Sequence, residues 1–499
     1  MNVEIKIVGD NTAKIRIEYF DAFEDLRSHF STLEKNFAYI KRCRAKGVKV
    51  QSGKEYIKKS CIKMNGEFEL GLLFDILTFC KNNFYNRTVS LILDDSIKEY
   101  IKSNNLKLDS NIFVNDSGAK PRNYQIESMQ IALNKQNGIY ILGTGAGKTL
   151  CTALLIHNLL KNNLTNKILL ICPFPDLANQ TFNEISLNLK DYNYKINKWF
   201  GNLKFDKDAQ VIIAGSNILR SQYSKYKNDL LKFNCIIVDE VHQLKANNKI
   251  STIIKELPAK FRYGFTGTLP DDKHDVWSLK GKIGPVRYNL PSAELRSDKF
   301  LTPVKSLGLR VTVDNIPKFV IDEDGSQRPF LYSDEVDWLS DNIKFNEIIT
   351  KIAGSLENNT LILINRIQHG ENLLELCQKR LPNKKVYFIQ GEVSLEERGD
   401  IKQQMEDSNN LIVIAQVATF STGINVKNIH NIIFPGLIGK STVRIVQSIG
   451  RGLRLNPNKS QLSLIDIIPN TKYCLKHIDI RKEIYSREKI PYTERILNL

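Results

Sequence analysis

Several side chains in this chain have the types and spacing needed to act on a phosphate group. A short apolar run at residues 139–142 leads into a glycine-rich turn at 143–147, and Lys148 and Thr149 then open a helix-periodic stretch. Strand, glycine-rich turn and helix form the context of a phosphate-binding loop, where backbone N–H groups and a helix N-terminus surround an anion. Lys148 is expected to reach the β- and γ-phosphates, and Thr149 to bind Mg²⁺. The pattern GxxxxGK[ST] is met only in its last three positions, because Leu142 stands where the first glycine is usual.

Two adjacent carboxylates, Asp239 and Glu240, leave a second apolar run at residues 235–238. Carboxylates at the end of a buried strand are costly unless they are paired or take part in chemistry. With a phosphate loop upstream, Asp239 is expected to hold Mg²⁺ through water, while Glu240 orients or deprotonates the attacking water. Without that loop, an acidic turn would be the default interpretation.

Two arginines later in the chain are candidates for contact with the same phosphate. Arg451 and Arg454 are three residues apart, which is the spacing of side chains on one helix face. Arginines that reach a bound γ-phosphate act as arginine fingers, and the alternative is a basic helix face on the surface.

Ahead of the phosphate loop, Gln125 has the donor and the acceptor needed to read adenine, although one glutamine alone is a weak signal.

The elements that must position these residues follow an alternating pattern. From Lys167 onward, helical stretches separate the buried-strand runs KILLICP, AQVIIAGS, NCIIVDE and RYGFTGT. A second series begins near Ile343 with TLILIN, KVYFIQ, NLIVIAQ and HNIIFPG, and Ser394 followed by Glu397 predicts a helix start within it. The alternation predicts an α/β protein with two doubly wound parallel sheets, in which ligands bind at the carboxyl ends of the strands.

A smaller α+β domain is expected at residues 1–115. Its strands are predicted in VEIKIVG, AKIRIEYF and VSLILDD and its helices at 21–28, with Asp21 as the N-cap, and at 70–82. Residues 103–121 are polar and rich in turn formers, which is typical of a linker. Between Lys35 and Lys63, ten lysines and arginines accompany a single acidic residue and three aromatic residues. Such a segment suits the phosphates and bases of DNA or RNA, and the alternative is a solvated sheet face.

Bulk composition narrows the class of protein. The 499 residues carry a net charge of +17, which favours a polyanionic partner such as nucleic acid. The alternative is a general compositional bias, since the chain is rich in Lys, Asn and Ile throughout. The eight cysteines are scattered without a CxxC pair, so we expect reduced thiols, no structural metal and a cytoplasmic protein. No apolar run approaches the ~20 residues of a membrane span, and the first residues alternate like a strand and contain no signal-peptide core.

Taken in order, these stretches resemble the motifs of a superfamily 2 helicase. They are YQ (124–125), GTGAGKT (143–149), ICPFPDLANQ (171–180), VIIAGS (211–216), DEVH (239–242), TGT (266–268), LILINR (361–366), FSTGINV (420–426) and QSIGRGLR (447–454). More narrowly, the chain resembles the phage UvsW-type DNA helicases in its length, its small N-terminal domain and the stretches FEDLRSHF and GEVSLEER. Asn425 departs from the acidic or small residue usual at that position.

The resemblance implies two RecA-like lobes with ATP between them and assigns roles to residues. Catalytic roles go to Lys148, Asp239, Glu240, Gln447, Arg451 and Arg454. ATP binding goes to Tyr124, Gln125, Gly143, Thr144, Gly145, Ala146, Gly147, Lys148 and Thr149, and Mg²⁺ to Thr149 and Asp239. Nucleic-acid contacts go to Pro173, Gln180, Gly215, Ser216, Arg366, Ser421, Thr422, Gly423 and Asn425. His242, Thr266 and Thr268 are expected to couple the two sites.

The expected organisation is an N-terminal nucleic-acid-binding domain at 1–115, a first lobe at 116–300, a connecting segment at 301–342, a second lobe at 343–470 and a tail at 471–499. The expected activity is that of an ATP-driven DNA helicase or branch-migration translocase on forks, Holliday junctions and D- or R-loops, acting as a monomer without a membrane. The alternatives are an RNA helicase, which shares the motor chemistry, and the motor of a restriction complex. A non-catalytic nucleic-acid-binding module would have lost Lys148, Glu240 and Arg454, which are all present.

Overall fold

The computed structural model covers residues 1–499 and describes all of them except residues 36–38, 41, 42, 44, 46, 51–55, 85–88, 115–117, 245–247, 323, 324, 392, 418–425, 437–441, 454, 457, 498 and 499. The side chains of residues 34, 35, 56–58, 395, 442–444, 447 and 451 are also outside the description. The chain divides into two compact units, Met1–Leu142 with Gly147–Asn289 and Gly143–Ala146 with Leu290–Leu499.

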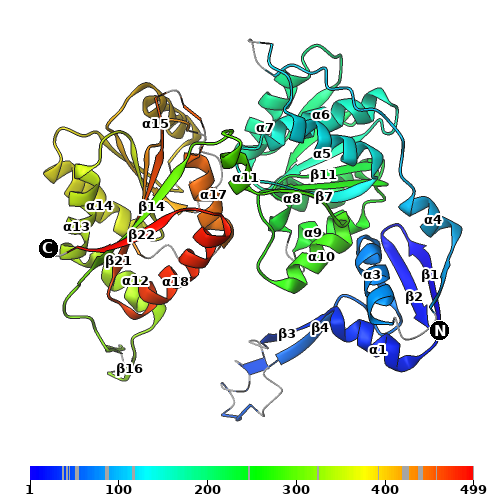
Figure 1. Ribbon diagram of the computed structural model, residues 1–499, viewed down its shortest axis with the longest axis horizontal. Helices are drawn as coiled ribbons and strands as arrows, with labels where there is room; N and C mark the ends of the chain where they lie inside the picture. Colours follow the sequence, from blue (N-terminus) through cyan, green and yellow to red (C-terminus); the bar gives the residue numbers. More distant parts are fainter. Residues whose placement is uncertain are drawn as a thin grey trace. The chain divides into compact units, whose positions relative to one another are not determined.

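The first unit begins with a small mixed sheet, and we call residues 1–101 the N-terminal module. Its strands run in the order β5-β2-β1-β6, with β1 antiparallel to β2 and parallel to β6. Helices α1 and α3 pack on one face, where Leu26 and Ile76 join Ile5 and Ile15 in the core (Figure 1). The elements are β1 (Asn2–Gly9), β2 (Thr12–Ile17), α1 (Phe20–His29), β5 (Glu67–Glu69), the 3-10 turn η1 (Leu70–Leu72), α3 (Leu73–Asn83), β6 (Ser90–Leu93) and α4 (Asp95–Ile101).

The predicted strands and helices of this module are confirmed, but the predicted helix cap is wrong. Tyr19 precedes α1, and Asp21 lies inside its first turn. Two further strands, β3 (Ser31–Lys35) and β4 (Tyr56–Ser60), form an antiparallel ribbon that extends away from the small sheet in Figure 1. The basic segment between Lys35 and Lys63 lies on this ribbon and on the residues that join its strands, and most of its side chains lie outside the described residues.

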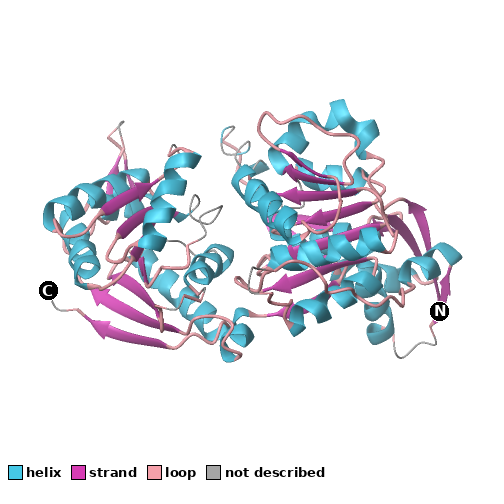
Figure 2. Ribbon diagram, turned by 90° about the horizontal axis from the view of Figure 1, so that it is seen from above, coloured by secondary structure: helices cyan, strands magenta, loops and turns pink. Residues whose placement is uncertain are grey.

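The first lobe follows as a seven-stranded sheet in the order β13-β7-β12-β11-β8-β10-β9. The strands from β7 to β9 pair in parallel, and β7, β8, β10, β11 and β12 are buried along their whole length, as expected of strands covered on both faces. Figure 2 shows helices on both sides of the sheet. The elements are α5 (Asn123–Asn134), β7 (Asn137–Leu142), α6 (Lys148–Lys161), β8 (Ile168–Cys172), α7 (Pro175–Asn188), β9 (Ile196–Trp199), β10 (Val211–Gly215), α8 (Ser216–Leu230), β11 (Cys235–Val238), the 3-10 turn η2 (Val241–Gln243), α9 (Lys249–Glu256), β12 (Phe261–Thr266), α10 (Lys273–Ile283) and β13 (Val286–Leu290).

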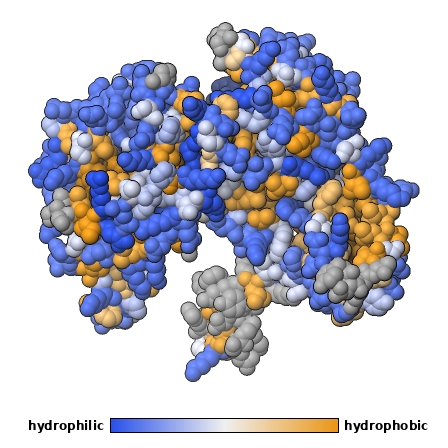
Figure 3. All heavy atoms as spheres, viewed as in Figure 1, coloured by the Kyte–Doolittle hydropathy of each residue, from blue (hydrophilic) through white to orange (hydrophobic). Residues whose placement is uncertain are grey.

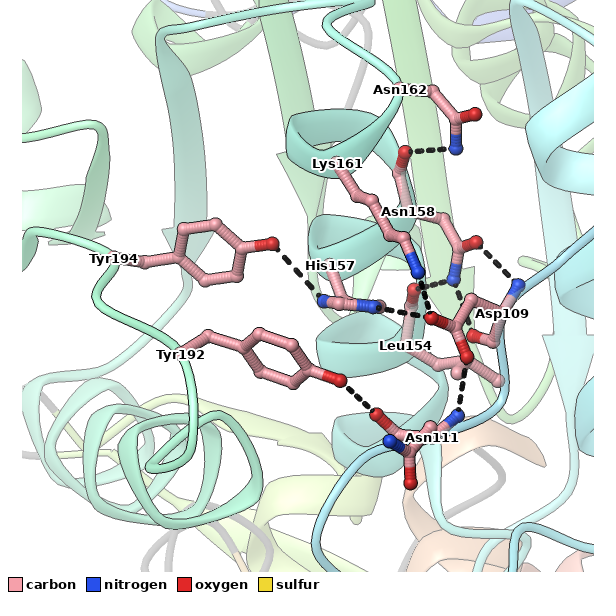
Figure 4. Close-up of polar contacts among 9 residues, drawn as sticks. All are labelled: Asp109, Asn111, Leu154, His157, Asn158, Lys161, Asn162, Tyr192 and Tyr194. Carbon is pink, nitrogen blue, oxygen red and sulfur yellow. Dashed lines mark hydrogen bonds and ion pairs between the residues drawn. The ribbon is translucent and has the colours of Figure 1, made fainter.

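The polar segment before this lobe is fixed in place. Residues 103–114, which we call the strap, form neither helix nor strand and run beside α6 (Figure 4). Asn158 holds the Asp109 backbone twice, because its Oδ1 accepts from the Asp109 N–H at 2.7 Å and its Nδ2 donates to the Asp109 carbonyl at 2.8 Å. As expected of a linker, the strap has no regular secondary structure, and its backbone is held against α6 by these hydrogen bonds.

The Asp109 side chain adds a charged anchor to the strap. Its carboxylate contacts Lys161 and accepts from His157 Nε2 at 3.3 Å, which leaves His157 Nδ1 to accept from the Tyr194 hydroxyl at 3.1 Å (Figure 4). Burial lowers the pKa of His157, so the ring is neutral at pH 7. Partial burial would raise the pKa of Asp109, but hydrogen bonds from Lys161 and from the Asn111 N–H hold it at about 2.

The second lobe is built on another seven-stranded parallel sheet, in the order β18-β19-β17-β20-β21-β14-β22. Its elements are α11 (Ser292–Ser297), β14 (Val304–Val311), β15 (Phe319–Ile321), β16 (Gln327–Pro329), α12 (Tyr332–Asp341), α13 (Ile343–Ser355), β17 (Thr360–Ile364), α14 (Ile367–Arg380), β18 (Val386–Ile389), α15 (Leu395–Asp407), β19 (Ile412–Gln416), β20 (Asn431–Phe434), α17 (Thr442–Gly452), β21 (Leu462–Pro469), α18 (Lys472–Arg487) and β22 (Tyr492–Ile496). Ser394 caps α15 as expected, with its Oγ 3.1 Å from the Glu397 N–H. The predicted fold class is confirmed by the two doubly wound sheets and the small α+β module.

Two segments expected to lie outside this sheet are part of it. Within the expected connecting segment at 301–342, β15 and β16 form a two-stranded ribbon and α12 is a helix, but β14 is an inner strand of the sheet. The segment at 471–499, expected to be a separate tail, supplies α18 and the edge strand β22 of this sheet. Arg481 on α18 is fully buried and pairs with buried Asp466 of β21 at 2.8 Å.

Among the described helices, none is long and apolar enough to cross a bilayer. Hydrophilic residues also cover most of the face of the lobes shown in Figure 3.

Candidate active site

The glycine-rich turn lies between β7 and α6, as the sequence predicted. Gly145 and Gly147 have φ of +88° and +79°, a region in which a side chain would be strained. Gly147 is the N-cap of α6, so Lys148 and Thr149 occupy its first turn, where backbone N–H groups have no partner within the helix. The turn can therefore offer these groups and the helix N-terminus to an anion.

Gln125 lies beside this turn on α5 and is almost completely buried. Its Oε1 accepts from the Arg122 N–H at 2.8 Å, and a Cβ added to Gly147 would lie 2.6 Å from its Nε2. Tyr124, which is also buried, accepts from the Arg122 guanidinium at 3.0 Å. The structure thus brings the glutamine of the predicted adenine-reading motif against the phosphate loop.

The two carboxylates follow β11 at the carboxyl edge of the sheet. Glu240 has φ +47°, a left-handed conformation that costs about 1–3 kcal/mol in a residue other than glycine and occurs preferentially at functional sites. In this conformation its two oxygens point to different partners. Oε1 lies 3.4 Å from Lys148 Nζ, and Oε2 lies 3.3 Å from His242 Nδ1. The phosphate-loop lysine and the acidic pair therefore form one cluster.

The two carboxyl groups have opposite electrostatics. Burial and the adjacent charge of Glu240 raise the pKa of Asp239. Burial would also raise the pKa of Glu240, but the Lys148 ammonium and His242 hold it below its usual range. Glu240 is thus ionised at neutral pH, and Asp239 is a carboxyl group whose ionised form needs a nearby cation. A divalent metal ion would supply that cation.

His242 connects the acidic pair to the TGT turn. Its Nε2 accepts from the Gln243 amide at 3.0 Å, so Nδ1 carries the proton and faces both Glu240 and Thr266 Oγ1, the latter at 2.8 Å. The Thr266 hydroxyl donates to the Thr268 carbonyl at 2.7 Å. The three residues expected to couple the sites therefore form a continuous hydrogen-bonded path from Glu240.

Two of the predicted nucleic-acid contacts of the first lobe meet at the ends of neighbouring strands. Pro173 follows β8 and Ser216 follows β10, and the Ser216 hydroxyl donates to the Pro173 carbonyl at 2.7 Å. Gln180 lies further along α7 and donates to Glu184 at 2.6 Å.

Sequence reasoning missed Phe200, which packs on this surface. It follows the edge strand β9, and a Cβ added to Gly215 would lie 3.2 Å from the Phe200 Cβ. The INKW run of β9 has no apolar alternation that would have predicted a strand, so nothing in the sequence placed Phe200 beside Gly215.

The structure describes the predicted residues of the second lobe only in part. Arg366 is half-exposed and donates to Asp337 at 2.8 Å. Gln447 and Arg451 are in α17, but their side chains lie outside the described residues, as do Arg454 and all of Ser421, Thr422, Gly423 and Asn425. The helix α17 ends at Gly452 and Arg454 lies outside the described residues, so the shared helix face of Arg451 and Arg454 stays a prediction.

Comparisons with known proteins identify the family of this chain. Residues 118–271 match the family model "Type III restriction enzyme, res subunit", and residues 343–456 match "Helicase conserved C-terminal domain". The chain is a superfamily 2 helicase, and therefore an enzyme that hydrolyses ATP. Over 530 aligned positions, covering 100% of both chains, it is 26% identical to the ATP-dependent DNA helicase uvsW of Enterobacteria phage T4.

Solved structures share the two-lobed fold. Dbp5 of S. cerevisiae bound to RNA and ADP BeF3 superposes with a TM-score of 0.54 at 13% identity, covering 76% of this chain and 91% of that chain. The helicase MrfA bound to DNA superposes with a TM-score of 0.55 at 15% identity, covering 80% of this chain and 57% of that chain. The RecA-like fold is therefore common to proteins that hold RNA and proteins that hold DNA.

Proposed function

We propose that this protein is an ATP-driven DNA helicase or translocase that acts on branched DNA, such as forks, Holliday junctions and D- or R-loops. The observation that carries the proposal is the similarity to uvsW, a protein named as a DNA helicase, over the whole chain. This similarity includes the N-terminal module, which both family models leave out. The basic segment between Lys35 and Lys63, at the ribbon of that module, is the candidate contact for a DNA arm.

In the ATP site, Lys148 binds the β- and γ-phosphates and Glu240 orients or deprotonates the attacking water. Mg²⁺ fits the donors at the edge of the sheet, since the Thr149 hydroxyl and the Asp239 carboxylate are the hard oxygen ligands that it prefers. Bound there, the ion would neutralise charge on the phosphates and keep Asp239 ionised. Gly143 to Gly147 surround the phosphates, and Tyr124 and Gln125 read the adenine.

In the second lobe, Gln447, Arg451 and Arg454 act on the γ-phosphate, so that hydrolysis removes an attraction between the lobes and changes their closure. Backbone phosphates of the nucleic acid contact two surfaces. In the first lobe these are Pro173, Gln180, Gly215 and Ser216, and in the second they are Arg366, Ser421, Thr422, Gly423 and Asn425. Such a grip is independent of sequence and weakens as salt rises.

The test compares the ATP turnover of the full chain with single-stranded DNA, duplex DNA, a four-way junction, a fork and RNA at one salt concentration. We expect the fork and the junction to stimulate most. Preferential stimulation by RNA would replace the proposal with an RNA helicase, because the fold alone does not distinguish the two. Lys148→Ala should abolish turnover and keep DNA binding, and full activity in that variant would refute the assignment of the ATP site.

A second experiment concerns the N-terminal module. Deletion of residues 1–115 should weaken binding of forked DNA more than it lowers the basal ATP turnover, because the basic segment is lost and the ATP site remains. Equal affinity for forks before and after the deletion would remove the role proposed for that segment.

A further inference from the structure

Helix α10 contacts both the N-terminal module and the catalytic loop of the first lobe. On one side, Leu279 and Ile283 belong to the same apolar core as Val238 and Val241, which flank the Asp239–Glu240 pair in the sequence. On the other side, Trp277 packs against the core of the module. One rigid helix therefore has the module on one face and the support of the ATP site on another.

The aromatic contact with the module is extensive. The Trp277 ring lies 5.4 Å from the Phe30 ring and 6.2 Å from the His29 ring, measured between centroids. Phe79 of α3 completes the cluster at 4.7 Å from His29. Trp277 thus extends from the first lobe into a group of rings contributed by the end of α1, by Phe30 directly after it, and by α3 of the module.

A backbone contact sets the distance between α10 and the module. Gly71, in the turn η1, lies so close to the last turn of α10 that an added Cβ would overlap the Lys280 carbonyl. Opposite it, a Cβ on Gly281 would lie 2.8 Å from the Glu69 Cβ. Because neither position has room for a side chain, the two backbones cannot slide past each other without separating.

Ion pairs fix the same contact in orientation. Lys280 of α10 lies 2.6 Å from Asp75 of α3, and both side chains are mostly buried. Lys282, which is 4% exposed, lies 3.3 Å from Glu69, and Lys255 of α9 reaches the other oxygen of Glu69 at 3.6 Å. Charged contacts at two separate points, together with the rings, resist rotation of the module on α10.

We propose that α10 couples the N-terminal module to ATP turnover, with Trp277 and Lys280 as positioning residues. A DNA arm that pulls on the module displaces α10, and the displacement reaches Glu240 through the apolar core that contains both Leu279 of α10 and Val241. This inference rests on the proposed function, in that the module holds a DNA arm. A passive anchor would share the geometry but would not make turnover depend on the arm.

The test reverses the charges of the pair formed by Lys280 and Asp75. Lys280→Glu and Asp75→Lys each place like charges 2.6 Å apart in the present geometry, and the double variant Lys280→Glu/Asp75→Lys restores attraction with the charges exchanged. Lys98→Ala is the matched control. Lys98 is an exposed lysine of the N-terminal module, and it pairs with Asp95 of its own helix instead of with α10.

Turnover is measured with forked DNA and with single-stranded DNA over a range of ATP and DNA concentrations. We expect the kcat on forked DNA to be about tenfold lower in each single variant, which is a typical size for coupling between two sites. The KM for ATP and the turnover on single-stranded DNA should be unchanged. The double variant should recover the stimulation, and Lys98→Ala should behave as the wild type.

The other outcomes distinguish a failure of this inference from a failure of the proposed function. If forks do not stimulate the wild type, the proposed function fails and takes the inference with it. If forks stimulate the wild type and both single variants equally, only the inference fails. If a single variant loses turnover on forked DNA, turnover on single-stranded DNA and thermal stability together, α10 is a passive anchor and the inference is also overturned. A double variant that does not recover stimulation by forks would overturn the inference as well.

Discussion

Glu240→Gln is expected to bind ATP more tightly while it hydrolyses ATP far more slowly. Lys148 Nζ lies 3.4 Å from Glu240 Oε1, and the two side chains are only 15% and 19% exposed. A γ-phosphate that recruits Lys148 must compete with this carboxylate. Glutamine keeps the shape and removes the charge, so the lysine becomes available at a lower cost.

The magnitude follows from the burial of the pair. A contact between charged groups contributes about 1.5 kcal/mol when it is partly shielded from water, which corresponds to about tenfold in the dissociation constant of ATP. The loss of the group that orients or deprotonates water lowers kcat by about 100- to 10,000-fold. Binding and turnover should therefore change in opposite directions in one variant.

The assay titrates a non-hydrolysable ATP analogue with Mg²⁺ into the wild type, Glu240→Gln, Lys148→Ala and the double variant. The gain in affinity should vanish when Lys148 is absent, because it arises from release of that lysine. A gain that persists without Lys148 would show that general repulsion between Glu240 and the phosphates was the cause. Unchanged affinity in Glu240→Gln would refute the reasoning altogether.

Three further predictions concern buried and shifted charges. Arg481→Met leaves Asp466 buried without its cation and should lower the free energy of unfolding by about 3 kcal/mol in calorimetry, whereas Arg481→Met with Asp466→Leu should regain most of it. The pKa of Asp239 is raised to about 7 by burial and by its acidic neighbour, so half-saturation of turnover should need more Mg²⁺ as the pH falls below 7, and Asp239→Asn should remove this dependence. Because the pKa of Asp109 is lower in the folded protein than in the unfolded chain, its carboxylate stabilises the fold at pH values above about 4, and this stabilisation is lost as the pH falls from about 4 to 2. Asp109→Ala should therefore lower the free energy of unfolding by about 1 kcal/mol at pH 7 and reduce the dependence of that free energy on pH in this acid range.

The sequence predicted the parts of the fold that are buried on both faces. β8, β10 and β11 are continuous apolar runs, because a parallel sheet with helices on both sides needs apolar residues on each face. β14 and β22 were not predicted. VKSLGLRV and YTERI both mix charged and small polar residues with apolar ones, which is also typical of an exposed extended segment.

The candidate site shows the same division. Lys148, Glu240 and His242 could be placed together because each follows a buried strand, and the carboxyl ends of parallel strands share one edge of a sheet. The burial of Arg481 could not be predicted, since its partner Asp466 is on another element and α18 reads as a solvated helix. The contact of Gly71 with α10 left no local signal either, because glycine occurs in many turns.

The position of β14 determines when the second lobe can form as the chain is synthesised. This strand lies between β21 and β22, so the residues on both its sides are made long after it. Contacts between segments so distant in sequence form slowly, and until then β14 presents two unpaired edges. In the first lobe, every strand from β7 to β13 is available by Leu290. We infer that the ATP-binding lobe folds on the ribosome first, while Val304–Val311 has no paired neighbours and is open to aggregation until β21 and β22 have been synthesised.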